Sequence, residues 1–171
     1  AGRRGEGADG VWGWVVPRGG LQAGLGARDA PLLEAARRLS GIAVDGAVNA
    51  DESGLGWAVK LEKGDFVGRK TLTTIRQGGP SRTLIGIQTK PGDIPRHGAT
   101  VKGEVAGNGV VTSGTHSFFL GYPIALAMVE VPSFRVGDRV AVEVRGRQAE
   151  AEVVKLPFYR GSARSAVAPK S

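Results

Sequence analysis

Arg28 is the side chain in this sequence best placed to bind an anion, because it stands in a segment whose two glycines leave the backbone free to turn. The segment reads Gly-Leu-Gly-Ala-Arg-Asp-Ala over residues 24–30. Glycine permits a tight turn or the close approach of a ligand, and a guanidinium offers a permanently charged fork to carboxylate or phosphate. The alternative interpretation is a helix that carries a merely solvated arginine, with Asp29 as its N-cap and Pro31 in its first turn.

The remaining residues with reactive side chains do not form a pattern typical of catalysis. His97 and His116 do not stand at metal-ligand spacing, and a zinc site needs three or four ligands. Ser113 precedes a glycine but lacks the strand-to-helix turn in which a nucleophilic serine works. We therefore expect these residues to lie in polar loops at the mouth of a β-barrel, and we expect no catalytic residue and no metal ligand in this chain.

Two glycine-rich segments are predicted to be structural. Gly103–Gly109 lacks the Lys-Ser/Thr pair that ends a phosphate-binding loop, and it lies between predicted strands, so we interpret it as a hairpin turn. In residues 64–69, Asp65 is predicted to cap a helix, with Phe66 in the core and Arg69 in the first turn.

Composition limits the class of protein and the kind of partner. The 171 residues are 41% hydrophobic and 23% charged, which is typical of a globular chain. The absence of cysteine excludes disulfides and thiolate catalysis. The net charge of +7 is spread along the chain without a run of five like charges. This distribution favours a polyanionic cofactor or an acidic protein partner over nucleic acid.

The same composition bears on where the protein works. No apolar stretch approaches the roughly 20 residues that span a bilayer, and no charged segment followed by an apolar run opens the chain as in a signal peptide. We expect a soluble, cytoplasmic protein.

The first 80 residues are predicted to be mainly helical. Residues 1–20 are expected to be frayed, with at most a short helix in 11–16. The predicted elements that follow are a helix over 27–40, an irregular loop over 41–55, a strand over 55–61 and a helix from Asp65 to Gly78.

Gly78-Gly79-Pro80 is the clearest internal boundary, because the hydrophobic period changes from 3.6 to 2 after it. Six short strands are predicted: Thr83–Gln88, Ala99–Lys102, Gly109–Ser113, Ile124–Val129, Arg139–Val144 and Gln148–Val154. The predicted fold class is therefore α+β, with a short helical N-terminal part packed on a C-terminal six-stranded antiparallel β-barrel. We divide the chain into residues 1–20, a segment over 21–79, the barrel over 80–165 and a disordered tail over 166–171.

Five segments in order carry a family resemblance. They are Gly-Ala-Arg-Asp at 26–29, Ser-Gly-Leu-Gly-Trp-Ala-Val-Lys at 53–60, Gly-Asp-Phe-Val-Gly-Arg at 64–69, Val-Thr-Ser-Gly-Thr-His-Ser at 111–117 and Val-Lys-Leu-Pro-Phe-Tyr-Arg-Gly-Ser at 154–162. Together they resemble the C-terminal half of the aminomethyltransferase family, the T-protein of the glycine cleavage system, from about residue 21 to residue 164. In that family, residues 21–79 would end the central folate-binding domain.

The resemblance implies a reaction and its participants. The family transfers a one-carbon unit from an aminomethyl group on a lipoylated carrier protein, the H-protein, to tetrahydrofolate, and ammonia is released. It also implies that Arg28 contributes to the tetrahydrofolate site. An arginine near the C-terminus does so too, and Arg164 is the nearest match, although an alignment shifted by one residue would put Ser165 there.

This chain also departs from the family pattern. Leu32, Ala36 and Ser40 stand where the family usually has arginine, glycine and tyrosine, whereas Glu34 is kept. Nothing in residues 1–20 resembles the family's first half, which holds most of the folate cavity and an aspartate near the reacting nitrogen. We therefore expect a fragment or a divergent remnant that is inactive alone, because a transferase needs its groups in one preformed site.

Two other functions stay open from the sequence. One is the folate-binding part of a dimethylglycine or sarcosine dehydrogenase, which is usually fused to a flavin domain. The other is a non-catalytic β-barrel module that binds a partner, for which steep salt dependence of oligonucleotide binding would indicate nucleic acid.

Overall fold

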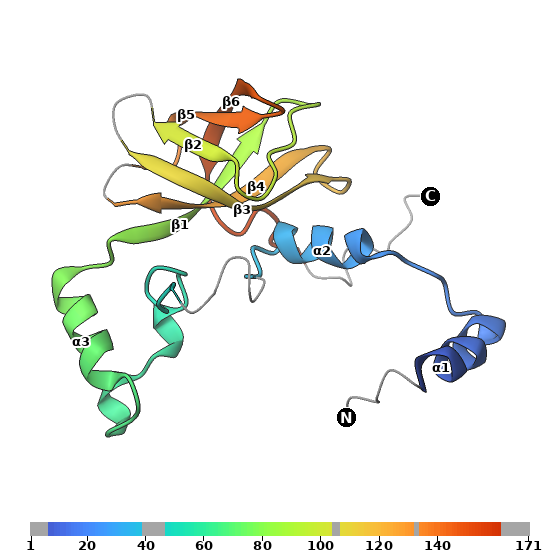
Figure 1. Ribbon diagram of the computed structural model, residues 1–171, viewed down its shortest axis with the longest axis horizontal. Helices are drawn as coiled ribbons and strands as arrows, with labels where there is room; N and C mark the ends of the chain where they lie inside the picture. Colours follow the sequence, from blue (N-terminus) through green and yellow to red (C-terminus); the bar gives the residue numbers. More distant parts are fainter. Residues whose placement is uncertain (1–6, 39–46, 104–106, 132–133, 162–171) are drawn as a thin grey trace.

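The computed structural model describes residues 7–38, 47–103, 107–131 and 134–161. Three α-helices lie in these residues, α1 (Ala8–Val15), α2 (Leu25–Glu34) and α3 (Arg69–Gly78), with the 3₁₀ turns η2 (Val16–Arg18), η3 (Gly56–Ala58) and η4 (Leu61–Lys63). Six strands follow: β1 (Arg82–Thr89), β2 (Thr100–Gly103), β3 (Asn108–Ser117), β4 (Tyr122–Glu130), β5 (Arg139–Val144) and β6 (Arg147–Val154). The predicted α+β class with a six-stranded barrel is confirmed (Figure 1).

The strands close into a barrel in the order β1-β4-β3-β2-β5-β6, in which β6 pairs with β1 and every pair is antiparallel. The turn between β5 and β6 shows how local sequence sets this topology. Arg145 and Gly146 have φ angles of 53° and 78°, and positive φ at both central residues is the geometry of a two-residue hairpin turn. Closure leaves the barrel without a free edge strand.

The barrel has one apolar cluster inside and a second one outside. Alternate residues of β4 divide between them: Ala125, Ala127 and Val129 face the interior cluster, and Ile124, Leu126 and Met128 belong to the outer one. The outer cluster is completed by Leu33 and Ala36 from the α2 segment and by residues after β6. Both faces of β4 are buried, and for this reason the residues inside the strand form a continuous apolar run.

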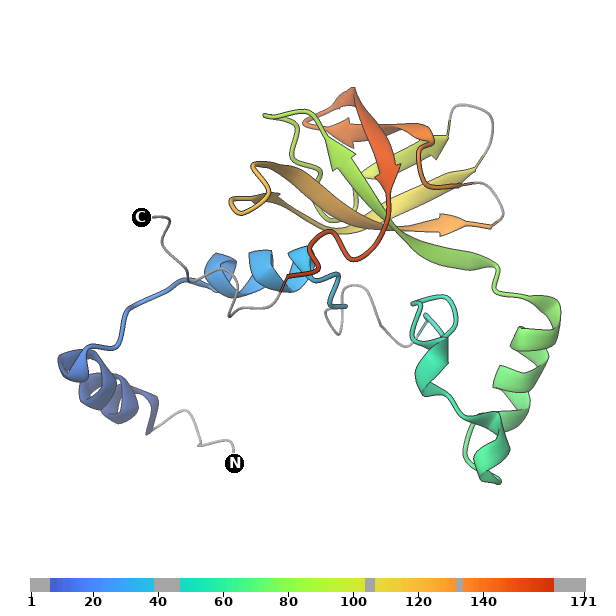
Figure 2. The same ribbon diagram turned by 180° about the vertical axis from the view of Figure 1, so that it is seen from behind.

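Helix α2 is the helix that covers the barrel. Its contacts are with β3 and β4, and Figures 1 and 2, seen from opposite sides, show it lying against the barrel while α1 and α3 extend away. No residue of α1 or α3 is buried. No described helix is both long and apolar enough to cross a bilayer.

The predicted bounds of α2 were wrong at both ends. The helix begins at Leu25 after the N-cap Gly24, so Asp29 and Pro31 lie inside it. The Asp29 carboxylate accepts from Arg28 at 2.8 Å and therefore does not cap the helix. The helix ends at Glu34 because Ala36 takes a φ of 51°, a left-handed conformation that stops helices.

Other expected bounds in the first 80 residues also differ. Helix α1 begins at Ala8, earlier than the helix expected at 11–16. Asp65 is not the N-cap of α3, since Gly68 precedes the helix and the Asp65 carboxylate accepts from the Phe66 backbone N–H instead. Phe66 is half-buried beneath the Lys63 ammonium and does not belong to either apolar cluster of the barrel. The expected stop at Gly78 is confirmed.

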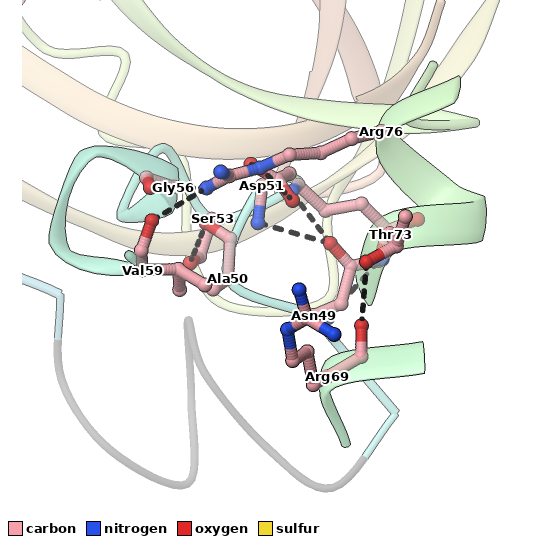
Figure 3. A network of polar contacts seen from close by, with 10 residues as sticks. Asn49, Ala50, Asp51, Ser53, Gly56, Val59, Arg69, Thr73 and Arg76 are labelled. Carbon is pink, nitrogen blue, oxygen red and sulfur yellow. Dashed lines mark hydrogen bonds and ion pairs between the residues drawn. The ribbon is translucent and has the colours of Figure 1, made fainter. Parts of the chain in front are cut away.

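The strand predicted over 55–61 was wrong, and Arg76 of α3 explains why (Figure 3). Its guanidinium donates to the carboxylate of Asp51 and to the carbonyls of Gly56 and Val59, the latter at 3.2 Å. Carbonyl groups engaged in this way have a side-chain partner in place of a neighbouring strand. The segment folds into the turns η3 and η4.

Glu52 anchors the loop before these turns to the start of β1. Its buried carboxylate accepts from Arg82 at 3.2 Å, from the Asn49 backbone N–H at 3.2 Å and from Ser81 at 3.0 Å. Burial raises the pKa of Glu52, but these hydrogen bonds outweigh it, so the pKa lies below its ordinary value. The carboxylate is thus stabilised in its ionised form by the fold.

We expect Arg82→Gln to lower the free energy of unfolding by about 1–2 kcal/mol at pH 7, less than for a fully buried pair because Arg82 is partly exposed. Because the pKa of Glu52 is lower in the folded chain, its ionised carboxylate stabilises the fold at pH values above its unfolded pKa of about 4.3. This contribution is lost as pH falls and the carboxylate is protonated. The difference in free energy of unfolding between Arg82→Gln and the parent chain should therefore shrink below about pH 4. Urea unfolding at several pH values measures it, with Lys102→Gln as the control. A constant difference across that range contradicts this role.

Limited proteolysis should separate the barrel from the rest. We expect cleavage near residues 76–82 or within the first 20, because the adjoining helices bury no residue. The expected product is a β-rich core from about residue 82 to residue 160. Circular dichroism of that product would overturn this expectation if it showed mainly helix.

Candidate functional site

A groove of about 410 Å³ lies between α2 and β3, and we call it the α2–β3 groove. One wall comes from α2 and the residues after it, the other from the loop between β1 and β2, and the floor from β3. Its lining residues are Gly26, Asp29, Leu33, Arg37, Arg96, His97, Thr112, Ser113, Gly114 and Thr115.

The helical wall follows from residue spacing. Asp29 and Leu33 are four residues apart in α2 and so lie along one side of it, and Arg37 follows after the helix has ended. Leu33 is buried against the barrel, whereas the Arg37 side chain is exposed. The left-handed turn at Ala36 ends the helix, and the Arg37 backbone N–H donates to the Leu32 carbonyl at 2.7 Å. Arg37 is therefore held at the groove in a fixed backbone turn.

The floor of the groove is an irregular stretch of β3. The register with β4 shifts between Val111 and Ser113, which leaves Thr112 as the extra residue of a β-bulge. Gly114 allows the facing loop to come close, since a Cβ there would lie 2.1 Å from the Pro95 carbonyl oxygen. The Thr-Ser-Gly-Thr segment thus lets the loop that carries Arg96 lie against the strand.

Arg96 and His97 are held on that loop by the same strand. The His97 Nδ1 atom donates to the Thr112 carbonyl at 2.9 Å. The Arg96 guanidinium makes a long contact of 3.4 Å with the Gly114 carbonyl and is exposed. Most of its donor groups therefore stay available to a ligand.

Arg28 lies on α2 and not in a loop, contrary to the first interpretation of its segment. Its side chain is 62% exposed and pairs with Asp29 at 2.7 Å. It does not line the α2–β3 groove. Two of its nitrogens, Nε and Nη2, contact Asp29, which leaves Nη1 to meet a carboxylate of a ligand or of a neighbouring domain.

Glu34 joins α2 to the barrel, a role that sequence reasoning missed. Its buried carboxylate accepts from the Ser117 hydroxyl at 2.5 Å, and that hydroxyl accepts from the Leu120 backbone N–H at 2.9 Å. Its carbonyl accepts from the Tyr159 backbone N–H at 2.9 Å. The helix is thereby fixed to two distant parts of the barrel domain.

The other residues singled out from the sequence fall outside this arrangement or only partly within it. Arg164 and Ser165 lie outside the described residues. Ser113 lies in strand β3, as the strand predicted over Gly109–Ser113 implies, and His116 lies in the same strand and not in the expected loop, with its ring edge-on against Phe118. Within the part of the chain that the structure describes, no three His, Asp or Glu side chains are grouped as metal ligands.

Comparison with known proteins decides the family of the barrel. Residues 82–160 match the model of the glycine cleavage T-protein C-terminal barrel domain. The barrel of this chain belongs to that family. We call it the T-protein barrel; its matched range runs from the first residue of β1 to the segment beyond β6, and of the five segments that carry the resemblance only the last two fall within the barrel region.

Similarity extends beyond the T-protein barrel to the helical part. The aminomethyltransferase of Nostoc sp. is 46% identical over 153 residues, which are 89% of this chain and 41% of the relative. That of Symbiobacterium thermophilum is 47% identical over 146 residues, 84% of this chain and 38% of the relative. The chain therefore spans about two fifths of the length of the curated relatives it matches.

A solved structure agrees with these sequence relatives. The crystal structure of the glycine cleavage system aminomethyltransferase T from Bartonella henselae matches with a TM-score of 0.74 and 33% identity. The match covers 80% of this chain and 39% of that one, so it includes more residues than the T-protein barrel alone.

Proposed function

We propose that this chain is the barrel-bearing part of an aminomethyltransferase of the glycine cleavage system. In this role the protein transfers a one-carbon unit from the aminomethyl group of a lipoylated carrier protein to tetrahydrofolate and releases ammonia. The observation that carries the proposal is the 46% identity to the Nostoc aminomethyltransferase across 89% of this chain. The net charge of +7 suits both an anionic folate and an acidic carrier protein.

The residues of this chain fit one side of a folate site. A folate carries carboxylates on its glutamyl tail, and Arg28 presents an exposed guanidinium with a free Nη1. Tetrahydrofolate, when bound, supplies the nucleophilic nitrogen that accepts the one-carbon unit. Arg28 binds and orients a carboxylate in this proposal, and Arg164 joins it on the strength of the family resemblance.

Glu34 serves the same site indirectly. Because it fixes the helix that carries Arg28 to the T-protein barrel through Ser117, it sets the position of that guanidinium relative to β3 and β4. It is a positioning residue, since its carboxylate is buried and faces the barrel and not a ligand.

Arg28→Lys should weaken folate binding about ten- to a hundredfold, because lysine keeps the charge but has no planar group that can hold Asp29 through two nitrogens and offer a third to the folate carboxylate. The test uses this chain joined to the remaining three fifths of the Nostoc relative, with calorimetric titration of tetrahydrofolate. The melting temperature should stay unchanged, since the side chain is 62% exposed.

Arg139→Lys is the matched control, because Arg139 is an exposed arginine outside the α2–β3 groove. Unchanged affinity in Arg28→Lys would remove Arg28 from the ligand site. A large drop in melting temperature with unchanged affinity would make it a structural residue.

A further inference from the structure

We propose that Met128 is a site of reversible oxidation, at which a peroxide converts the thioether to a sulfoxide and loosens α2 from the barrel. Hydrogen peroxide transfers one oxygen atom to Sδ. The S–O bond forms as the O–O bond breaks, so the sulfur is oxidised and the peroxide is reduced to water. Met128 is the single methionine of a sequence that has no cysteine. The proposal goes beyond the proposed function and does not depend on it.

A second groove, of about 370 Å³, gives a peroxide access to Met128 from solvent. Met128 itself is 8% exposed, but Val110, its neighbour on β3, is 46% exposed, so the groove is open beside the methionine. A groove of this size holds several molecules as small as water. We call it the β2–β4 groove, and its lining residues are Arg82, Thr100, Val101, Lys102, Asn108, Gly109, Val110, Met128, Val129 and Glu130.

Met128 also belongs to the outer apolar cluster, which includes Leu33 and Ala36 of the α2 segment. Its neighbour on β1, Leu84, is a member of the same cluster. A thioether suits such a cluster because it is apolar and flexible enough to fill an irregular gap. A sulfoxide is polar, and a polar group without a hydrogen bond in apolar surroundings costs free energy. Oxidation of Met128 therefore weakens the cluster that holds α2.

The β2–β4 groove offers the sulfoxide the polar partners that the cluster lacks. Lys102 and Asn108 are exposed, line the groove, and face each other across β2 and β3. Asn108 lies two residues before Val110 on β3, so its side chain is on the same face of the sheet. An ammonium and an amide both donate hydrogen bonds, and a sulfoxide oxygen accepts them. Oxidation thus favours a side chain turned to the groove, and reduction of the sulfoxide reverses that change.

The first experiment measures access to the sulfur. The folded chain is treated with hydrogen peroxide, and mass spectrometry follows the gain of one oxygen atom on the peptide that contains Met128. We expect a rate no more than about a hundredfold below that of methionine in a short unfolded peptide, because the groove opens beside the side chain. A slower rate would be that of attack on the small unfolded fraction alone and would overturn the proposal.

A pair of valine variants shows whether the groove is the route. Val110→Ala widens the β2–β4 groove and should accelerate oxidation about two- to threefold. Val136→Ala is the matched control, because Val136 is an exposed valine that does not line the groove, and it should leave the rate unchanged. Equal rates in both variants would mean that the peroxide does not enter through the groove, which would overturn the proposal.

The second experiment measures the effect on α2. Oxidation should lower the melting temperature by about 2–4 °C. It should accelerate amide exchange more at Tyr159, whose N–H donates to the Glu34 carbonyl, than in β5. A methionine sulfoxide reductase with a thiol reductant should restore both values. An oxidised chain with an unchanged melting temperature and unchanged exchange at Tyr159 would overturn the proposal.

Met128→Leu controls for oxidation elsewhere in the chain. Leucine is apolar and of similar size, so this variant should fold as the parent chain does. It has no sulfur, and the same peroxide treatment should change neither its melting temperature nor its exchange at Tyr159. Equal changes in Met128→Leu would come from another side chain and would overturn the proposal as well.

Discussion

Replacing Ser117 by alanine should lower the free energy of unfolding of this chain by about 3 kcal/mol, although the change removes a single oxygen atom. The Ser117 side chain is fully buried, and its hydroxyl donates to the Glu34 carboxylate at 2.5 Å. Without it, the buried carboxylate loses its donor, and leaving a buried charged group unpaired costs more than a typical hydrogen bond contributes.

The companion variants separate this interaction from a simple loss of packing. Glu34→Gln should destabilise less, because the amide oxygen can still accept from Ser117. The double variant Glu34→Leu with Ser117→Ala should recover part of the loss, since replacing both partners by apolar groups can be nearly neutral. Thr115→Ala is the control from the same strand, because its hydroxyl makes only a 3.5 Å contact with the neighbouring His116 carbonyl.

Urea unfolding gives the stabilities, and amide hydrogen exchange at Tyr159 reports directly on the helix. The Tyr159 N–H donates to the Glu34 carbonyl, so its exchange should accelerate in Ser117→Ala if α2 loosens from the barrel. Losses below about 0.5 kcal/mol in both single variants would mean that the apolar contacts of Leu33 hold the helix without this pair.

The isolated chain should show no tetrahydrofolate-dependent release of ammonia from an aminomethyl-loaded carrier protein. The chain spans about two fifths of its relatives, and the α2–β3 groove is a surface groove with one helical wall. A transferase gains most of its rate from holding reactants in one preformed site. Turnover by this chain alone, above the rate with denatured chain, would contradict the expectation.

The barrel could be predicted from the sequence because its determinants are local. Strand β5 alternates buried residues with exposed or partly buried ones, and its predicted bounds, Arg139–Val144, are the observed ones. Strand β4 could be predicted too, since burial on both faces leaves a continuous apolar run. The hairpin turn Arg145-Gly146 is signalled by its glycine, which adopts positive φ without strain.

The helical part was harder to predict because distant residues decide it. The sequence pattern over 55–61 favours a strand. In the structure, Arg76 of α3 donates to the carbonyls of Gly56 and Val59, so these groups do not pair with a neighbouring strand. Asp29 fits the pattern of an N-cap, but the helix begins four residues before it, at Leu25. Neither the Arg76 contacts nor this earlier helix start follows from hydrophobic period, which is the main signal available in a sequence.

The candidate site lay beyond sequence reasoning for a related reason. Arg37 and Arg96 meet at one groove because α2 is fixed against the barrel by the contact between Glu34 and Ser117, 83 residues apart, and by the packing of Leu33. The one sequence signal was the four-residue spacing of Asp29 and Leu33, which places them on one side of α2, whereas Arg37 reaches the groove through the left-handed turn at Ala36. Arg28 was singled out from its glycine-flanked segment, its folate role came from the family resemblance, and that role stays a prediction.

The central claim, that this chain is the barrel-bearing part of an aminomethyltransferase, is tested most directly by exchange. The chain replaces the matching 41% of the Nostoc aminomethyltransferase, and the release of ammonia from aminomethyl-loaded carrier protein is measured with and without tetrahydrofolate. The intact relative and the relative lacking the matched part are the two controls. We predict tetrahydrofolate-dependent activity clearly above that of the shortened relative. A soluble chimera that melts cooperatively, yet releases no more ammonia than the shortened relative, would contradict the claim.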